Sequence, residues 1–230
     1  MRILSILQKA IKNTRDGFHL NSPHWQNYKA NLPMLPKNLF DVAFGMIISE
    51  ATMYRVSKEA YIKFEQGYAQ KALIDHLFNL FATYCFMTDP GIRMDISKGP
   101  RSGLVKSYWF KTFSFPCFSI LWDLFYLDGK KVIIKGLVFN HINNVSLAYW
   151  VMGDGSLDGQ TLQLNTQGFT KEENVIISEE LNAKFDLNSR VIVHKGKYFV
   201  VQFPYTDGPK LNAIISPHML PSFSYKVPRA

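Results

Sequence analysis

Hydrophobic positions follow two periods along the chain, one helical and one alternating, and the segments come in a similar order in both halves. In the first half, residues 41–50 are an apolar run of helical character that ends on a carboxylate. Residues 69–86 place apolar side chains three or four positions apart, which indicates an amphipathic helix. Short alternating runs predict strands. We expect helix, strand, strand, helix, strand, strand and helix over residues 41–50, 51–57, 59–66, 69–86, 91–97, 106–114 and 118–127.

The second half repeats this order. Residues 146–154, SLAYWVMGD, are again an apolar run that ends on an acid, and a strand-like run follows at 161–166. Thr170 followed by Glu173 has the spacing of a capping box, which predicts a helix over 170–185. A hairpin and a closing helical run are expected at 190–194, 198–203 and 211–220. Each half therefore reads as αββαββα, which indicates duplication of one unit.

The repeat divides the chain into four parts. We expect a basic N-terminal arm in residues 1–38, a first unit in 39–127, a basic linker in 128–144 and a second unit in 145–230. The run MRILSILQKAIKNTR at the start is basic and contains no acid. Its composition fits a mitochondrial transit peptide and equally fits a basic arm that folds against RNA. We expect the arm to lie outside the duplicated core, because alone it lacks a core to pack.

Composition and charge narrow the class of protein. Hydrophobic residues make up 47% of the 230 positions, so the chain can bury a core and is not a disordered tail. The formal net charge of +8 indicates an acidic partner, either nucleic acid or an anionic membrane. No apolar run approaches the ~20 residues that span a bilayer. Cys85 and Cys117 form neither a disulfide framework nor a zinc motif, and they fit two buried thiols in a reducing compartment.

The two apolar runs end on Glu50 and Asp154. If the two helices pack side by side about a pseudo-twofold axis, these carboxylates meet at one end of the interface. Clustered carboxylates repel each other unless a divalent cation lies between them, so the pair predicts a Mg²⁺ site. The alternative is that each acid is an ordinary helix-end carboxylate. Close helix packing needs small residues, and the runs supply Gly45, Ser49, Ala148 and Gly153.

These features resemble the single-chain LAGLIDADG homing endonucleases of mitochondrial group I introns, with a degenerate first motif. LAYWVMGDGS at 147–156 resembles the second motif helix, and TLQLNTQGFTKEE at 161–173 resembles the strand and helix that follow it. LPSFSYKVP at 220–228 resembles the C-terminal stretch, and FGMIISEAT and IKFEQG within 44–67 stand in the place of the first motif helix and its second strand. The likeness implies an α+β fold: two pseudo-twofold-related αββαββα units whose antiparallel sheets form a nucleic-acid-binding saddle.

The resemblance also implies a catalytic centre. In that family, an acid at the foot of each motif helix binds metal ions, and a lysine lies near each metal site. An active enzyme would therefore use Mg²⁺, with Glu50 and Asp154 as metal ligands and Lys131 and Lys226 as further catalytic residues. Ser49-Glu50 departs from the usual Gly-Asp pair. The extra methylene moves a carboxylate by about 1–1.5 Å, which can cost ~10²-fold in rate. The alternative for the lysines is an ordinary solvated role.

The sequence also predicts a surface for nucleic acid. Alternate residues of a strand face the same way, and basic side chains interleaved with aromatic ones suit phosphate contact and base stacking. The alternative is a set of solubilising charges. The candidate nucleic-acid-binding residues are Arg55, Lys58, Lys63, Arg93, Arg101, Lys106, Lys111, Arg190, Lys195, Lys197 and Tyr198.

Three classes of function remain, and the least favoured is a membrane-surface or protein-binding module. The favoured one is a LAGLIDADG-fold protein with impaired or lost nuclease activity, repurposed to bind structured RNA as a splicing maturase or a mitochondrial ribosomal component. Glu50 and the basic arm favour it. The alternative is an active Mg²⁺-dependent, site-specific DNA endonuclease, which Asp154 and the two lysines favour. Both imply a protein of the mitochondrial matrix, monomeric in itself, with RNA or duplex DNA as partner and no membrane. Ribosomal or other ribonucleoprotein proteins are further partners of the first.

Overall fold

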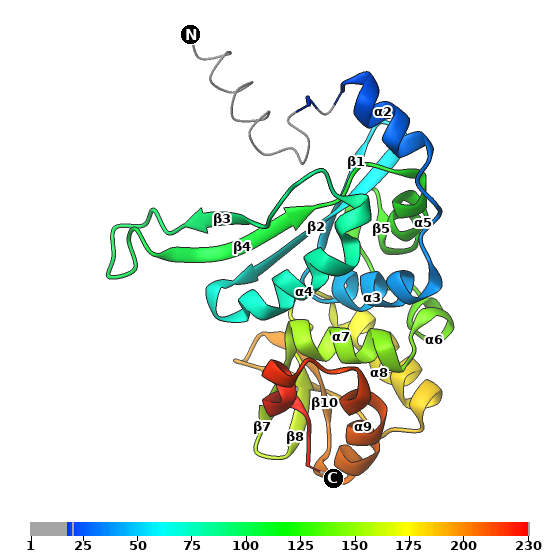
Figure 1. Cartoon of the computed structure of the whole chain (residues 1–230). Coiled ribbons are helices and arrows are strands. Elements are labelled where there is room, and N and C mark those ends of the chain that lie inside the picture. The colour runs from blue at the N-terminus through cyan, green and yellow to red at the C-terminus, as the bar shows by residue number, and fades with distance from the viewer. Residues whose placement is uncertain (1–17, 20, 230) are drawn as a thin grey trace. The chain divides into compact units, whose positions relative to one another are not determined.

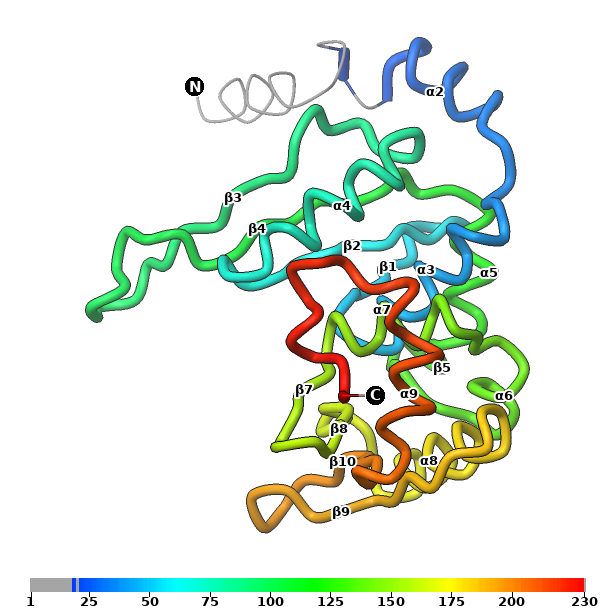
Figure 2. Tube along the Cα trace, turned by 60° about the horizontal axis from the view of Figure 1, so that its bottom comes forward, coloured from blue at the N-terminus to red at the C-terminus, as the bar shows by residue number. Residues whose placement is uncertain are grey.

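Helices and antiparallel strands fall into two compact units (Figures 1 and 2). The structure is a computed structural model that describes residues 18, 19 and 21–229, so most of the predicted N-terminal arm, residues 1–17 and 20, lies outside the described residues. Unit 1 contains the described residues up to Pro36 together with Ala51–Ile120, and unit 2 contains Lys37–Glu50 and the described residues from Leu121 onward. The mixture of helices and antiparallel sheets confirms the predicted α+β class.

Unit 1 is built on a four-stranded antiparallel sheet in the order β1-β2-β4-β3. One face is covered by helix α4 (Lys71–Phe81), where the rings of Phe64 and Phe110 stack with centroids 4.7 Å apart. Both rings are fully buried, and they form the core of this unit with Phe81. The strands are β1 (Thr52–Val56), β2 (Glu59–Gly67), β3 (Gly91–Met94) and β4 (Val105–Lys111), and 3-10 turns at Tyr68–Gln70 and Ala82–Tyr84 flank α4.

Helix α2 (Pro23–Ala30), which precedes the sheet in the chain, packs into unit 1. The Trp25 side chain is fully buried, with its ring centroid 5.3 Å from that of Phe113. The Tyr28 hydroxyl donates a hydrogen bond to the main-chain oxygen of Thr83. The described end of the predicted arm is therefore part of a core, contrary to the expectation that the arm lies outside it. The aromatic side chains explain the difference, because they bury a large apolar area.

Unit 2 contains a second antiparallel sheet, whose order β7-β8-β10-β9 repeats that of unit 1. Helix α5 (Pro116–Phe125) begins in unit 1 and ends in unit 2. The elements of unit 2 are α3 (Lys37–Ile48), β5 (Tyr126–Leu127), β6 (Lys130–Lys131), α6 (Leu137–His141), α7 (Asn144–Asp154), β7 (Gly155–Asp158), β8 (Thr161–Leu164), α8 (Lys171–Phe185), β9 (Arg190–His194), β10 (Tyr198–Phe203) and α9 (Gly208–Ile215), with 3-10 turns at Tyr205–Asp207, Ser216–His218 and Pro221–Lys226.

Helices α3 and α7 pack closely because glycines remove side chains at their points of contact. A Cβ on Gly45 would lie 2.2 Å from the main-chain oxygen of Ser146, and a Cβ on Gly153 would lie 2.5 Å from Ser49 Oγ. The Ser49 hydroxyl occupies the space that Gly153 leaves, and it donates to the Gly45 main-chain oxygen at 2.9 Å. This contact confirms the prediction that residues 42–50 pack against 146–154.

The predicted basic linker is partly regular structure, since it contains β6 and α6. Two carboxylates of α8 hold it. Glu173 Oε1 accepts a hydrogen bond from the backbone N–H of Ile133 at 2.8 Å, and Glu180 accepts from the backbone N–H groups of Gly136 and Phe139. These bonds satisfy backbone donors that a loop would otherwise leave to water, and they fix the chain directly after β6.

Two further differences concern boundaries. Strand β7 follows α7 without a break. The repeated order αββαββα implied a strand at this place, but the sequence pattern gave no residue range for it, because four residues are too few to show an alternating period. The compact units also cut across the predicted ones, since α3 groups in space with α7. The capping box of Thr170 and Glu173 is present and starts α8. Among the helices that the structure describes, none is long and apolar enough to cross a membrane.

Candidate functional site

The carboxyl groups of Glu50 and Asp154 meet in unit 2, where α3 and α7 end. Asp154 is the last residue of α7, and Glu50 follows shortly after the last residue of α3. A hydrogen bond joins the two carboxyl groups. The structure therefore brings together the acids that the sequence pairs, and the longer side chain of the glutamate does not separate them.

This environment favours the protonated form of Asp154. Burial raises the pKa of Asp154 to about 8, with the hydrogen bond to Glu50 and the charge of Glu50 acting in the same direction. The ammonium groups of Lys131 and Lys226 oppose the rise but do not cancel it. The pair therefore retains a proton near neutral pH, and a cation bound between the carboxylates would displace that proton.

Lys131 and Lys226 each lie against the end of one of the two helices. Lys131 Nζ donates to the main-chain oxygen of Ile47 at 2.6 Å. Lys226 Nζ donates to the main-chain oxygens of Met152 at 2.8 Å and Val151 at 3.4 Å. Carbonyls at a helix C-terminus carry partial negative charge, which stabilises an ammonium group. Burial lowers the pKa of Lys131 to about 8 and also lowers that of Lys226, while the acid pair acts against both shifts.

The chemistry of this cluster fits a hard divalent cation. Two carboxyl groups held together in a buried place present oxygen ligands, which Mg²⁺ prefers. Within the described residues, no group of three or more His, Cys, Asp or Glu side chains is placed to hold a metal. Glu50 and Asp154 would thus supply two ligands, and water or phosphate oxygens would supply the others, as is usual for Mg²⁺.

In unit 1, the sheet face opposite α4 carries basic and aromatic side chains, and we call it the open face of unit 1. The strand register places Lys63 beside Lys111 and Tyr54 beside Tyr61. The two tyrosine rings stack with centroids 5.2 Å apart, and the Lys111 ammonium lies 5.6 Å from the Tyr61 centroid. Cations next to exposed rings suit contact with phosphates and stacked bases.

Glu65 lies among the cations of the open face and was not predicted as a site residue. Its carboxylate forms ion pairs with Lys63 at 2.5 Å and Arg93 at 3.3 Å, and it accepts a hydrogen bond from the Ser107 hydroxyl at 2.6 Å. Burial alone would raise the pKa of Glu65, but these hydrogen bonds and charges outweigh it and lower the pKa. Glu65 therefore stays ionised and orients the two cations. Its alternation with Lys63 along β2 was the available sequence signal.

The other predicted basic residues of unit 1 do not share the open face. Because side chains alternate along a strand, Arg55 and Lys106 lie on the face that α4 covers, beyond the helix itself. Lys58 lies in the turn between β1 and β2, and Arg101 lies in the connection between β3 and β4. Their role in binding nucleic acid stays a prediction.

In unit 2, the predicted basic residues gather on the β9–β10 hairpin. Lys195 and Lys197 flank its turn, and Lys195 has a positive φ of 50°. The Lys197 ammonium lies 4.7 Å from the ring centroid of Tyr198, which is 39% exposed. Arg190 donates to Gln202 Oε1 at 3.2 Å on the neighbouring strand. The four predicted residues thus present three cations and one ring on a single element.

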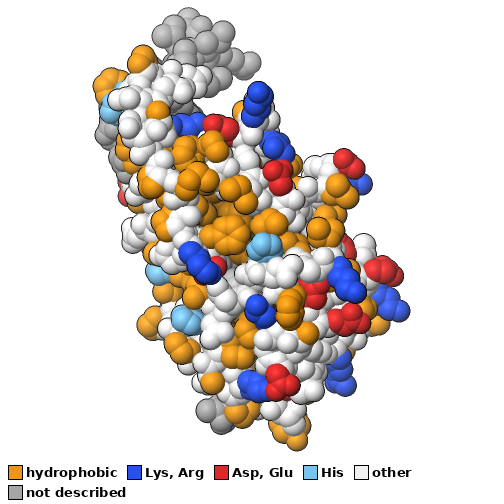
Figure 3. Space-filling model, turned by 90° about the vertical axis from the view of Figure 1, so that its right-hand side faces the viewer, with side chains coloured by type: hydrophobic (Ala, Val, Ile, Leu, Met, Phe, Trp, Pro, Cys, Tyr) orange, Lys and Arg blue, Asp and Glu red, His pale blue; other side chains and the backbone are white. Residues whose placement is uncertain are grey.

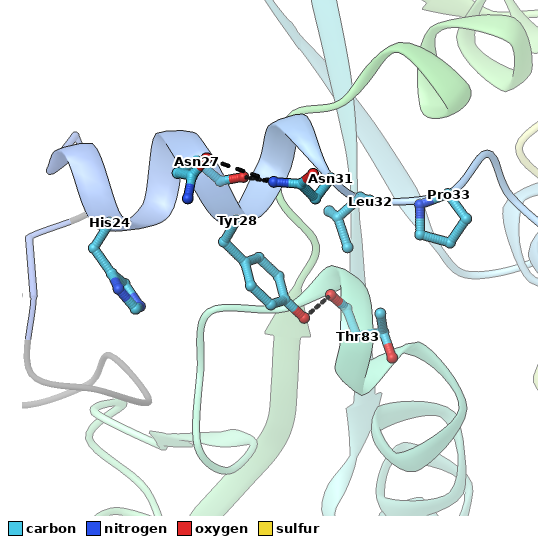
Figure 4. A pocket seen from close by; sticks show the side chains of 7 residues that line it. All are labelled: His24, Asn27, Tyr28, Asn31, Leu32, Pro33 and Thr83. Carbon is cyan, nitrogen blue, oxygen red and sulfur yellow. Dashed lines mark hydrogen bonds between the residues drawn. The ribbon is translucent and has the colours of Figure 1, made fainter.

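Two other surface features bear less relation to this chemistry. The face in Figure 3 mixes hydrophobic, basic and acidic side chains and shows no concentration of positive charge. A pocket of ≈ 410 Å³ in unit 1 lies beside α2 (Figure 4) and contains no carboxylate or lysine. It is lined by His24, Asn27, Tyr28, Asn31, Leu32, Pro33 and Thr83.

Comparison with known proteins finds a matching family and several similar proteins. Residues 40–211 match the LAGLIDADG DNA endonuclease family. The probable intron-encoded DNA endonuclease 3 of Mycosarcoma maydis is 55% identical over 133 residues, 55% of this chain and 97% of that protein. The probable intron-encoded endonuclease 1 of Wickerhamomyces canadensis is 29% identical over 231 residues, 96% of this chain and 98% of that protein. The cytochrome b mRNA maturase bI2 of Saccharomyces cerevisiae is 26% identical, over 94% of this chain and 53% of the maturase.

A solved structure is similar in both fold and extent. The homing endonuclease I-WcaI bound to its DNA recognition sequence has a TM-score of 0.85 and 29% identity, with coverage of 92% of this chain and 95% of that chain. The meganuclease I-SmaMI bound to uncleaveable DNA, at a TM-score of 0.52 and 13% identity, shares the fold. These findings confirm the resemblance drawn from the motifs.

Proposed function

The chain belongs to the LAGLIDADG DNA endonuclease family, and we propose that it is a divalent-cation-dependent, site-specific DNA endonuclease with Glu50 and Asp154 at its catalytic centre. The observation that carries the proposal is the hydrogen-bonded acid pair with a lysine against each helix end. Carboxyl groups with perturbed pKa values cluster at catalytic sites, and contact with phosphates does not require two acids held together. The likeness to DNA-bound I-WcaI along nearly the whole chain supports the same activity.

Each residue of the cluster has a role in phosphodiester hydrolysis. Glu50 and Asp154 would hold Mg²⁺ through their carboxylate oxygens. When bound, the cation lowers the pKa of a coordinated water and neutralises charge on the phosphate. Lys131 and Lys226 keep their ammonium groups close to the acids, where they stabilise negative charge that develops on the phosphate oxygens.

The two sheets supply the binding surface of this proposal. The open face of unit 1 offers Lys63, Arg93 and Lys111, and the β9–β10 hairpin of unit 2 offers further cations. Affinity for duplex DNA should fall with salt by about 0.9 in log K per tenfold salt for each phosphate neutralised. Removal of Lys111 should lower that slope by about one.

The proposal is tested by cleavage of a randomised plasmid library. The purified full chain is incubated with the library in Mg²⁺ or in EDTA, and new DNA ends are sequenced. We expect ends at one sequence class, in Mg²⁺ alone. The Asp154→Asn variant is the control, and it should bind the selected site without producing ends. Failure of the wild-type chain to cut any sequence would contradict the proposal.

Binding of structured RNA is the second candidate function. The similarity to a cytochrome b mRNA maturase over 94% of this chain favours it. In this case the open face of unit 1 would bind an RNA helix by its backbone and shape, and ribonucleoprotein proteins would be its neighbours. Competition between a folded intron RNA and the selected DNA duplex for the full chain would separate the candidates. RNA binding at least tenfold tighter, unaffected by Asp154→Asn, would support RNA binding.

The setting that we propose is the mitochondrial matrix, on the support of the intron-encoded relatives and the cytochrome b mRNA maturases. Cell fractionation with an antibody to the native protein tests it. Enrichment with matrix markers is the expected result.

A further inference from the structure

Asn165, the first residue after β8, holds the main chain of Asp154 with two donors. Its backbone N–H donates to the Asp154 main-chain oxygen at 3.1 Å, and its side-chain Nδ2 donates to the same oxygen at 2.7 Å. The last carbonyls of a helix have no partner within the helix. Asn165 therefore fixes the main chain of Asp154, the residue that ends α7. The side chain of the same residue carries the carboxylate that the proposed function uses.

The amide of Asn165 is itself oriented by glutamines. Its Oδ1 accepts from Gln163 Nε2 at 2.8 Å and from Gln167 Nε2 at 3.4 Å. Since Oδ1 is engaged in this way, Nδ2 is turned toward Asp154. The hydrogen bonds form one connected path from β8 to the acid pair, all within unit 2.

Gln163 connects this path to the surface of the sheet. Leu162 and Leu164 are fully buried on one face of β8, so Gln163 lies on the other. There it pairs across the sheet with Gln202, the residue that Arg190 contacts. Among the described residues, the side-chain amide of Gln163 shows no hydrogen bond besides that to Asn165. It can therefore still contact a base edge or a phosphate.

The corresponding position of the first half has different chemistry. Glu65 follows Phe64 as Asn165 follows Leu164, but its carboxylate contacts Lys63, Arg93 and Ser107 on its own sheet. A carboxylate cannot donate to a main-chain oxygen. Among the described residues, the path through an asparagine belongs to the second half.

We propose that Asn165 is a positioning residue for the Asp154 carboxylate and that Gln163 couples it to nucleic acid on the sheet of unit 2. The inference rests on the proposed function for its catalytic part, and on geometry alone for its cation-binding part. Removal of a residue that orients a metal ligand typically lowers metal affinity or activity by about 10–100-fold. Asn165→Leu removes the side-chain donor, keeps the number and branching of the side-chain heavy atoms, and leaves the backbone bond.

The test measures cation affinity and cleavage separately. Mn²⁺ binding to the full chain without DNA is followed by electron paramagnetic resonance, and single-turnover cleavage is measured at saturating selected duplex. For Asn165→Leu we expect a roughly 10–100-fold loss in Mn²⁺ affinity and a similar loss in cleavage rate. Duplex affinity, measured in Ca²⁺, should change less than about threefold, which a general loss of folding would not allow.

Asn182→Leu is the matched control. Asn182 lies on α8, and its amide makes two hydrogen bonds to the main chain of Ser189. Its replacement removes the same chemical groups at a place away from the acids. It should therefore lower the stability of the fold and leave Mn²⁺ affinity unchanged. Gln163→Leu keeps the bonds from Asn165 to Asp154, and it should reduce the cleavage rate with a smaller change in Mn²⁺ affinity. If Asn165→Leu does not fold, Gln163→Leu decides the question.

The outcomes separate this inference from the proposed function. The inference is overturned if Asn165→Leu binds Mn²⁺ as tightly as the wild-type chain. It is also overturned if Asn165→Leu and Gln163→Leu both cleave at the wild-type rate. In either case the endonuclease function stands. If the wild-type chain cuts no DNA, the endonuclease proposal fails, and Mn²⁺ affinity alone then supports or overturns the positioning role.

Discussion

The two acids of the candidate site end matching helices, but the chain holds them in different ways. Asp154 is the last residue of α7, and its main-chain oxygen receives two donors from Asn165. Glu50 lies beyond the last turn of α3 and reaches Asp154 through a longer side chain. Both halves of the sequence therefore bring a carboxyl group to the same site. They differ in the length of the side chain and in the contacts that place it.

The same contrast applies to the small residues between the helices. The first helix has Ser49 where the second has Gly153, and these two positions face each other. The Ser49 hydroxyl fits on one side because there is no side chain on the other. Gly153 in the second motif thus compensates for Ser49 in the first. Neither motif shows this when it is considered alone.

Substitution of Gly45 should have the largest effect on this arrangement. A Cβ there would lie 2.2 Å from the Ser146 main-chain oxygen, so Gly45→Ala must push the helices apart. We expect a loss of about 3 kcal/mol in the free energy of unfolding, at the upper end of the usual range for overpacking. Urea denaturation followed by circular dichroism measures it. Gly67→Ala is the control, because no atom lies within 4 Å of the added Cβ; equal losses in the two variants would contradict the packing described.

The acid pair should make the cation-free protein less stable as pH rises. The pKa of Asp154 is raised to about 8 in the folded chain, above its ordinary value of 3.8. The folded state therefore binds the proton more tightly, and the stability that this gives is present below about pH 4 and lost as pH rises through 8. The slope is at most about 1.4 kcal/mol per pH unit.

Thermal denaturation between pH 5 and pH 7.5 in EDTA measures this slope. Asp154→Asn should flatten it, and Mg²⁺ should raise the melting temperature most at the upper end. A melting temperature that rises with pH in the wild-type chain, and equally in Asp154→Asn, would show that the two acids do not share a proton.

Ser49→Gly should have the smallest effect. It restores glycine at the departing position and removes the hydrogen bonds from Oγ to the main-chain oxygens of Gly45 and Met46. We expect a loss of about 1 kcal/mol in the free energy of unfolding, from the added backbone freedom of glycine and the lost bonds. The selected duplex should be cut within about threefold of the wild-type rate. A large gain in rate would mean that Ser49 holds the acids apart.

The sequence allowed the repeat, the helix pair and the acid pair to be predicted, because each depends on a local pattern. Apolar runs that end on an acid, with small residues inside, indicate both the helices and their contact. The position of α2 was not predictable in this way, since the burial of Trp25 depends on Phe113, far along the chain. Charge patterns likewise did not show that Glu65 orients the cations around it or that Asn165 holds Asp154.

The open face of unit 1 shows that the positions of charges in the sequence do not by themselves predict which face of the sheet a side chain occupies. Lys63 and Lys111 are neighbours across two strands, whereas Arg55 and Lys106 point the other way. The face of each residue follows from its place in the alternation along the strand and from the pairing of that strand with its neighbours. A one-residue shift in register would reverse the assignment.

The central claim is that Glu50 and Asp154 act as one catalytic centre, and strand-resolved cleavage of a single selected duplex tests it most directly. Wild-type chain, Glu50→Gln and Asp154→Asn are compared at saturating DNA in Mg²⁺, with each DNA strand labelled separately. The account predicts that either substitution slows cleavage of both strands by at least about 10²-fold, because the acids share one site and a misplaced ligand alone costs that much. Wild-type rates on both strands in Glu50→Gln would contradict it.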